Sequence, residues 1–227
     1  TALGTTGSGT TIAATGTLEI NGAAIGAEAI TFNGGAITGT GTSSLSGDIT
    51  LGANSNLNGT GTLTLSGLIS GSTFGITKAG SGTVTLSGTN TYTGVTTINA
   101  GVLSVATIGN GGVAGNLGQA TSSAANLVLG GGTLQYTGST ASTDRAFTLT
   151  NATSSSIDVT TNNLTISGAS AATSGALTKI GNGTLTLSGA NAYTGTTTIN
   201  AGTLSAANAT ALGTTGSGTT IAATGTL

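Results

Sequence analysis

The chain contains no cysteine, proline, methionine, tryptophan or histidine among its 227 residues. Without cysteine it forms no disulfide bond and no thiolate metal site. Without histidine and cysteine it lacks the usual pairings of nucleophile and general base that hydrolases employ. These absences narrow the possible chemistry before any sequence pattern is considered.

Charge is also scarce, with three Lys or Arg and five Asp or Glu residues. A surface with so few cations offers no basic path for a phosphate backbone and no cationic face for anionic lipid. No apolar run reaches the roughly 18 residues that a spanning helix needs. We therefore expect no nucleic-acid partner and no membrane insertion of this segment.

What the chain does contain is 42 Gly and 52 Thr, together with Ile, Leu and Val in short alternating runs. Such runs, bounded by Gly, Asn or Ser, predict β-strands, and no interval has the apolar spacing of a helix. The chain is therefore predicted to be all-β. The expected strands are Thr17–Ile20, Ala29–Phe32, Ser44–Ser46, Ile49–Leu51, Thr62–Ser66, Thr83–Ser87, Thr96–Ile98, Val102–Val105, Asn126–Leu129, Thr133–Tyr136, Ala146–Leu149, Ser156–Val159, Leu164–Ser167, Thr184–Ser188, Thr197–Ile199 and Thr203–Ser205.

Two kinds of internal repeat organise the chain. Residues 78–106 and 179–207 lie 101 residues apart and are identical at 21 of 29 positions, and residues 1–18 recur unchanged as 210–227. We interpret residues 1–209 as a long unit with two related internal copies, and residues 210–227 as the start of the next unit. The chain is then one continuous segment, residues 1–227, cut from something longer.

The repeats decide between the possible all-β architectures. Self-similarity at a fixed offset, with Gly or Asn at the corners, favours a solenoid over a sandwich, barrel or propeller. Rungs of roughly 20–25 residues would give about eight to ten rungs per unit and a rise of about 40–50 Å. In the run Gly183–Gly189, the alternation places Leu185 and Leu187 inward, and Ile199 and Leu204 follow inward around an Asn-Ala-Gly turn.

The run GTLTLSGANAYTGTTTINAGTL, which begins at Gly183, resembles the autotransporter-associated β-strand repeat, also called the passenger-associated transport repeat. The resemblance covers about a quarter of the chain. The matching positions of the second copy are Lys179, Gly181, Gly183, Asn191, Tyr193, Gly195 and Leu204, and those of the first copy are Lys78, Gly80, Gly82, Asn90, Tyr92, Gly94 and Leu103.

This resemblance implies a right-handed parallel β-helix (β-solenoid) that is exported to the bacterial cell surface or beyond. It also implies that the repeat assists the secretion and folding of long passengers rather than chemistry. The implied location is extracellular.

The charged residues are the natural candidates for catalysis or metal binding. Enzymes on β-helices gather carboxylates, Lys or Arg into a site, and calcium rolls need aspartates in a glycine-rich nonapeptide. Asp48, Asp158 and the pair Asp144-Arg145 are scattered, and we interpret the pair as a local ion pair or a solvated corner. Lys78 and Lys179 occupy equivalent repeat positions, which favours a structural role at a rung edge. We predict no catalytic, cofactor-binding or metal-binding residue, and no cofactor.

Three other features have a functional and a structural interpretation. The Gly-rich segments Gly109–Gly115 and Gly130–Gly132 lack the helix and Lys of a phosphate loop and are interpreted as corners. Tyr92, Tyr136 and Tyr193 are either sugar-stacking platforms or, as we favour, packed at rung corners. The Thr-x-Thr pairs at Thr62/Thr64, Thr83/Thr85 and Thr184/Thr186 are either an ice-ordering array or ordinary strand formers.

Four functions are considered, and two of them are favoured. The first is a non-catalytic extracellular rod or filament whose partners are neighbouring repeat units and sister rods. The second is an adhesin or passenger stalk that binds carbohydrates or surfaces. An ice-binding protein and a polysaccharide lyase of the β-helix type are less favoured, because the lyase needs a carboxylate cluster that this sequence does not supply.

Overall fold

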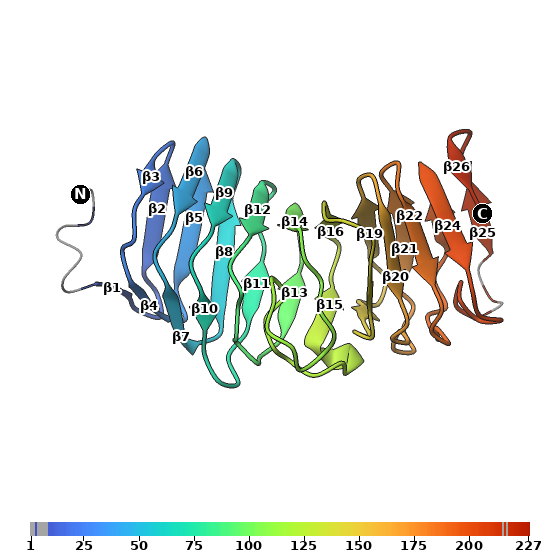
Figure 1. Ribbon diagram of the computed structural model, residues 1–227, viewed down its shortest axis with the longest axis horizontal. Helices are drawn as coiled ribbons and strands as arrows, with labels where there is room; N and C mark the ends of the chain where they lie inside the picture. Colours follow the sequence, from blue (N-terminus) through green and yellow to red (C-terminus); the bar gives the residue numbers. More distant parts are fainter. Residues whose placement is uncertain (1–2, 4–8, 215, 217) are drawn as a thin grey trace.

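The computed structural model describes residues 3, 9–214, 216 and 218–227. Short strands succeed one another along the chain, and each pairs in parallel with the equivalent strand of the next turn. The result is an elongated stack with the two ends of the chain at opposite ends of the long axis (Figure 1). The all-β class and the solenoid architecture predicted from the sequence are confirmed.

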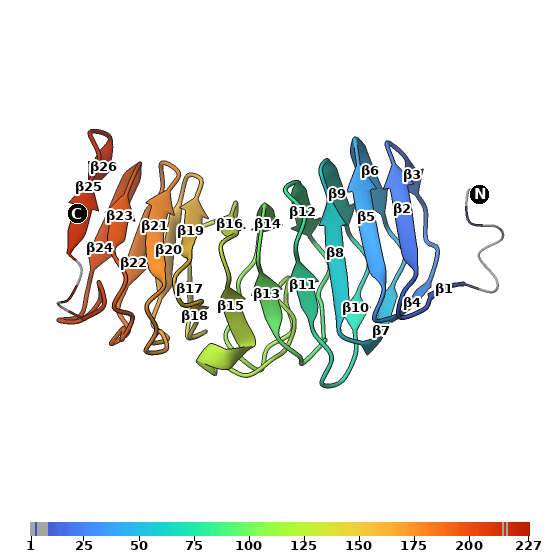
Figure 2. The same ribbon diagram turned by 180° about the vertical axis from the view of Figure 1, so that it is seen from behind.

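The strands form four parallel sheets. The four-stranded sheet contains β1 (Thr10–Ile12), β4 (Ile30–Asn33), β7 (Ile49–Ala53) and β10 (Ile69–Ser70). The seven-stranded sheet, seen in Figure 2, contains β2 (Thr17–Asn21), β5 (Ala36–Thr40), β8 (Ser55–Gly59), β11 (Ile76–Lys78), β13 (Thr96–Ile98), β15 (Leu127–Leu129) and β18 (Thr148–Leu149).

The ten-stranded sheet runs the length of the stack. It contains β3 (Ala24–Ile25), β6 (Thr42–Leu45), β9 (Thr62–Leu65), β12 (Thr83–Leu86), β14 (Val102–Val105), β16 (Thr133–Tyr136), β19 (Ser154–Val159), β21 (Ala176–Ile180), β23 (Thr197–Ile199) and β25 (Thr219–Ile221). The five-stranded sheet contains β17 (Ala141–Thr143), β20 (Asn163–Ile166), β22 (Thr184–Leu187), β24 (Gly202–Ala206) and β26 (Gly225–Thr226).

These four sheets cover three faces. The chain order places β10 between β9 and β11, and it places β17 between β16 and β18 in the same way. The four-stranded and five-stranded sheets therefore lie on one face, here called the first face. The seven-stranded sheet is the second face and the ten-stranded sheet is the third. A long connection that includes the 3₁₀ turn η1 (Ala124–Asn126) separates the two sheets of the first face.

The core is a set of aliphatic ladders inside these faces. Leu185, Leu187, Ile199 and Leu204 are buried, as the alternation predicts. On the third face the inward positions stack in register over five consecutive rungs. They are Leu63, Val84, Leu103, Leu134 and Ile157. Each rung thus removes apolar surface of its neighbours from water, which is the main favourable term in folding.

All sixteen strands expected from the sequence overlap observed strands, but ten further strands were not predicted. Several of them place an unusual residue inside. Gly39 of β5 is buried. A larger residue does not fit there, because a Cβ would lie 2.7 Å from the Cβ of Leu63. Ser55 of β8 is buried and donates to backbone carbonyls, and Lys78 of β11 is also buried. These residues break the apolar alternation that reveals a strand in a sequence.

The two related copies occupy different faces. The first copy begins on the second face with β11 and continues on the third face with β12. The second copy begins on the third face with β21 and continues on the first face with β22. The 101 residues between them therefore span four turns and one further face.

Candidate functional site

The carboxylates do not converge. Asp48 is exposed and accepts a hydrogen bond from the Leu68 amide, and Asp158 on the third face accepts one from Gln135 at 2.9 Å. Across the part of the chain that the structure describes, no group of three or more Asp, Glu, His or Cys side chains is placed to hold a metal ion. The prediction that the chain has no catalytic or metal-binding residue remains a prediction.

Arg145 lies beneath a long irregular connection of the chain. Its side chain is buried, so the interpretation of Asp144-Arg145 as a solvated corner is wrong for the arginine. The guanidinium donates to five backbone carbonyls, with distances from 2.8 to 3.4 Å. The acceptors belong to Gly109, Asn110, Val113, Gly118 and Ala120. Because a buried cation needs such compensation, these carbonyls replace the water that the arginine lost.

The five acceptors all lie in one connection, residues 106–122, which we call the stapled loop. Asp144 lies outside this loop and binds it twice. Its Oδ1 accepts from the Gly111 amide at 2.7 Å, and its own amide donates to Asn110 Oδ1 at 3.1 Å. Thr143 Oγ1 donates to the Gly109 carbonyl at 2.9 Å. Side chains of the following turn therefore hold the loop, and an antiparallel backbone bridge between Gly115 and Asn90 also ties it to the preceding rung.

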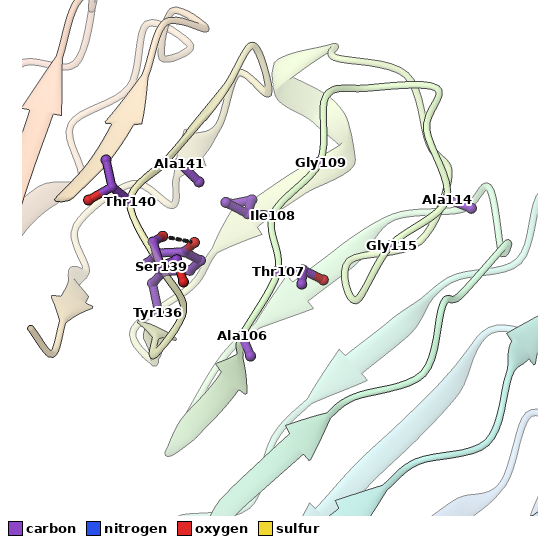
Figure 3. A pocket seen from close by; sticks show the side chains of 10 residues that line it. All are labelled: Ala106, Thr107, Ile108, Gly109, Ala114, Gly115, Tyr136, Ser139, Thr140 and Ala141. Atoms are coloured by element: carbon purple, nitrogen blue, oxygen red, sulfur yellow. Dashed lines mark hydrogen bonds between the residues drawn. The ribbon is translucent and has the colours of Figure 1, made fainter. Parts of the chain in front are cut away.

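A groove of about 320 Å³ opens beside the stapled loop (Figure 3). Its walls are mostly small or apolar, and they come from the loop and from the segment that joins β16 to β17. The lining residues are Ala106, Thr107, Ile108, Gly109, Ala114, Gly115, Tyr136, Ser139, Thr140 and Ala141. None of them carries a charge, so the groove offers shape and hydroxyl contacts to a neutral partner but no acid or base for catalysis.

The two lysines of the repeat are buried, and their ammonium groups bind the backbone inside the rung corners. The Lys78 ammonium donates to the carbonyls of Gly80 and Ala100. The Lys179 ammonium donates to the carbonyls of Ile180, Gly181 and Ala201. Each ammonium thus satisfies carbonyls of its own corner and of the corner one rung further on. Burial lowers the pKa of both lysines to about 8, although Asp158 partly opposes this shift at Lys179.

The asparagines of the repeat connect three successive rungs. Asn90 Oδ1 accepts from the Ile69 amide and its Nδ2 donates to the Asn116 carbonyl, both at 2.8 Å. In the second copy, Asn191 makes the same pair of bonds to Ser170 and Ala211, both at 2.7 Å. A side-chain amide is suited to this position because it has both a donor and an acceptor.

The tyrosines are packed and not displayed. Tyr92 and Tyr193 are fully buried, and their hydroxyls pair with Thr96 and Thr197 at 2.7 Å. Tyr136 is also buried and donates to the Ser139 carbonyl. Burial raises the pKa of Tyr92 to about 12. The interpretation of these rings as corner packing is supported, and the fully buried rings of Tyr92 and Tyr193 present no face for sugar stacking.

Threonine hydroxyls form columns on the outside. The longest column follows the third face in register through nine rungs, with one valine. Its members are Thr42, Thr62, Thr83, Val102, Thr133, Ser156, Thr178, Thr198 and Thr220. Thr62/Thr64 and Thr83/Thr85 are neighbours on this face, but Thr184/Thr186 lies on the first face. The Thr-x-Thr pairs therefore do not share one plane.

The buried lysines predict an alkaline rise in stability. Their folded pKa of about 8 lies below the ordinary 10.5, so the unfolded chain binds more protons between these values and stability increases with pH. From pH 8 to 9.5 we expect the free energy of unfolding to increase, because the lysines lose their protons at a lower pH in the folded chain than in the unfolded chain. Above pH 10 the raised pKa of Tyr92 acts in the opposite direction, because only the unfolded tyrosine ionises.

Denaturant unfolding at pH 7.5, 8.5 and 9.5 measures this effect. The double variant Lys78→Met/Lys179→Met should lose the rise, since no buried ammonium remains to be neutralised. A midpoint of the unmodified chain that is flat or falls over this range would contradict the assignment.

Arg145→Met should release the stapled loop, because five carbonyls lose a shared donor while the side-chain length is kept. We expect hydrogen exchange of residues 106–122 to accelerate at least tenfold, with little change in β9, β12 and β21. Gln119→Met, an exposed change in the same loop, is the control and should leave exchange unaltered. Equal loop protection in both variants would rule out the staple.

The described residues include no helix long and apolar enough to cross a membrane. No solved structure matches the chain. The chain is 41% identical over 210 residues to the adhesin BmaC autotransporter of Brucella suis biovar 1 (strain 1330). This alignment covers 86% of the chain but only 6% of the adhesin.

The family Passenger-associated-transport-repeat matches residues 76–105 and 177–206. These are the two copies whose buried Lys, Asn and Tyr side chains have equivalent partners in their own and neighbouring rungs. The chain therefore belongs to the autotransporter-associated repeat proteins, and its two copies are passenger-associated transport repeats.

Proposed function

We propose that this segment is a non-catalytic, extracellular rod in the passenger of a bacterial surface adhesin, built from tandem 209-residue solenoid units. The observation that carries the proposal is the ten-stranded third face, in which every rung pairs with the next from β3 to β25. Because this parallel ladder is unbroken, hydrogen bonds join every pair of neighbouring rungs along the axis, as a stalk requires. The similarity to an autotransporter adhesin supports a location at the cell surface.

The positions of the charged residues also support a durable external rod. All three Lys and Arg residues, which are the cleavage points of trypsin, are buried. Lys78 and Lys179 are each held by backbone carbonyls of two successive corners, and Arg145 is held by five carbonyls of the stapled loop. Opening one corner would therefore not present a cleavage point unless rungs also separated.

Electron microscopy of the chain, together with trypsin digestion, tests the rod. We expect elongated particles and an intact chain after mild trypsin treatment, because buried Lys78, Arg145 and Lys179 cannot enter the protease. Chymotrypsin serves as a comparison, since Tyr92 and Tyr193 are buried in the same way. Compact globules, or rapid cleavage at any of these three residues, would contradict the proposal.

A second role, adhesion to carbohydrates, surfaces or sister rods, is favoured by the neutral outer surface. The hydroxyl columns and the groove beside the stapled loop supply contacts that do not depend on charge. Such binding would persist at high salt, because it involves few ion pairs. An ice-binding role is less favoured, since the Thr-x-Thr pairs divide between two faces.

A further inference from the structure

We propose that successive 209-residue units are turned by one face, about a third of a turn, relative to one another. Each surface of the unit, the stapled loop included, then faces a different side of the rod in three consecutive units. A partner that recognises one such surface meets it on all three sides. This inference rests on the tandem arrangement proposed above and concerns how that rod displays its contacts.

Two stretches of identical sequence lie at opposite ends of the chain. Residues 10–18 and 219–227 are the same, yet their strands join different faces. β1 pairs with β4 on the first face, whereas β25, which has the same sequence, pairs with β23 on the third face. Likewise β2 pairs with β5 on the second face, whereas β26 pairs with β24 on the first.

The number of turns in one unit follows from the third face. β3 lies two faces after β1 along the chain, and β25 is the tenth strand of the sheet that β3 begins. From β1 to its copy β25 the chain therefore makes nine complete turns and two further faces. Because this is not a whole number of turns, a second unit begins one face short of the position where the first began.

The copies at the two ends also show what would cover the far end of the rod. Ile12 is 4% exposed because it pairs with Phe32 of β4, whereas the equivalent Ile221 is 48% exposed. Each of the two strands pairs on one side only, β1 with the rung that follows it and β25 with the rung that precedes it. Among the described residues, the rung that would follow β25 is lacking. A strand with the sequence of β4, laid on β25 in the register of β1 with β4, would bury Ile221. That strand would then lie on the third face.

The stapled loop lengthens one rung without adding a face. The third-face strands advance by 21 residues from Thr62 to Thr83, but by 31 residues from Val102 to Thr133, where the loop is inserted. The related copies at 78–106 and 179–207 are separated by four turns and one face. The whole unit accumulates a shift of two faces in the forward direction, which is equivalent to one face backward.

The rotation between units determines which sides of the rod carry the stapled loop. The stapled loop interrupts the first face in this chain, between β10 and β17. In the next unit it would interrupt the third face, and in the one after that the second. With about 4.8 Å between rungs, successive loops would be about 46 Å apart along the axis. A rod of several units would therefore engage partners, sister rods included, from three directions instead of along one edge.

A chain of two units tests this inference. It is made by adding a second copy of residues 19–209 after Leu227, and its structure is determined by cryo-electron microscopy or crystallography. We expect the second loop to interrupt the third face, about 46 Å from the first. The face that carries the loop is read relative to the sheets, so any gradual twist of the stack does not affect the answer.

A matched control replaces the second unit by one from which the loop's extra residues, 109–118, are removed. This unit should stack on β25 in the same register, but it should lack the protrusion, which identifies the loop density without ambiguity. If the loops lay on the same face in both units, the proposed rotation between units would be wrong, but the rod would still stand. A two-unit chain whose units do not stack would overturn the tandem rod itself, and the turn with it.

Discussion

Parallel backbone pairing between successive rungs is the interaction on which the rest of this structure depends. It brings equivalent residues of neighbouring turns to within about 5 Å of each other, so each side chain must fit above a residue in the same situation. Inward positions accordingly hold Ile, Leu and Val in register. At the corners the constraint is tighter. A Cβ at Gly67 would lie 2.1 Å from the Gly47 carbonyl oxygen, and one at Gly88 would lie 2.1 Å from that of Gly67.

The same constraint explains how the few cations are used. Corners leave backbone carbonyls without a strand partner, and a buried carbonyl without a donor is destabilising. Lys78 and Lys179 supply such a donor inside two equivalent corners, and Arg145 supplies five inside the stapled loop. The charge of these residues stabilises irregular backbone, and Coulombic attraction to Asp158 and Asp144 adds to this at Lys179 and Arg145. Because all three cations are buried, the outer surface carries almost no charge.

The sequence predicted the regular parts of the fold well and the irregular parts poorly. Alternation in runs such as Thr184–Ser188 identified sixteen strands, and the repeated Asn and Tyr positions identified the family. Strands β5 and β8 were missed because Gly39 and Ser55 occupy inward positions, where close approach of the next rung or a bond to a carbonyl determines the residue. The role of Arg145 was missed because its five acceptors lie 25 to 36 residues away in the chain. The shift of the second copy by one face depends on the summed length of all corners, which no local pattern contains.

Pyrene excimer fluorescence directly measures the shift by one face between the related copies. Thr178 of the second copy lies beside Ser156 on the third face. If the copies were in phase, Thr178 would instead lie beside Thr148 on the second face, as Thr77 lies beside Asn56. Pyrene attached to Ser156→Cys/Thr178→Cys should therefore give strong excimer emission, and pyrene attached to Thr148→Cys/Thr178→Cys should give little. The reverse result would contradict the register on which this account rests.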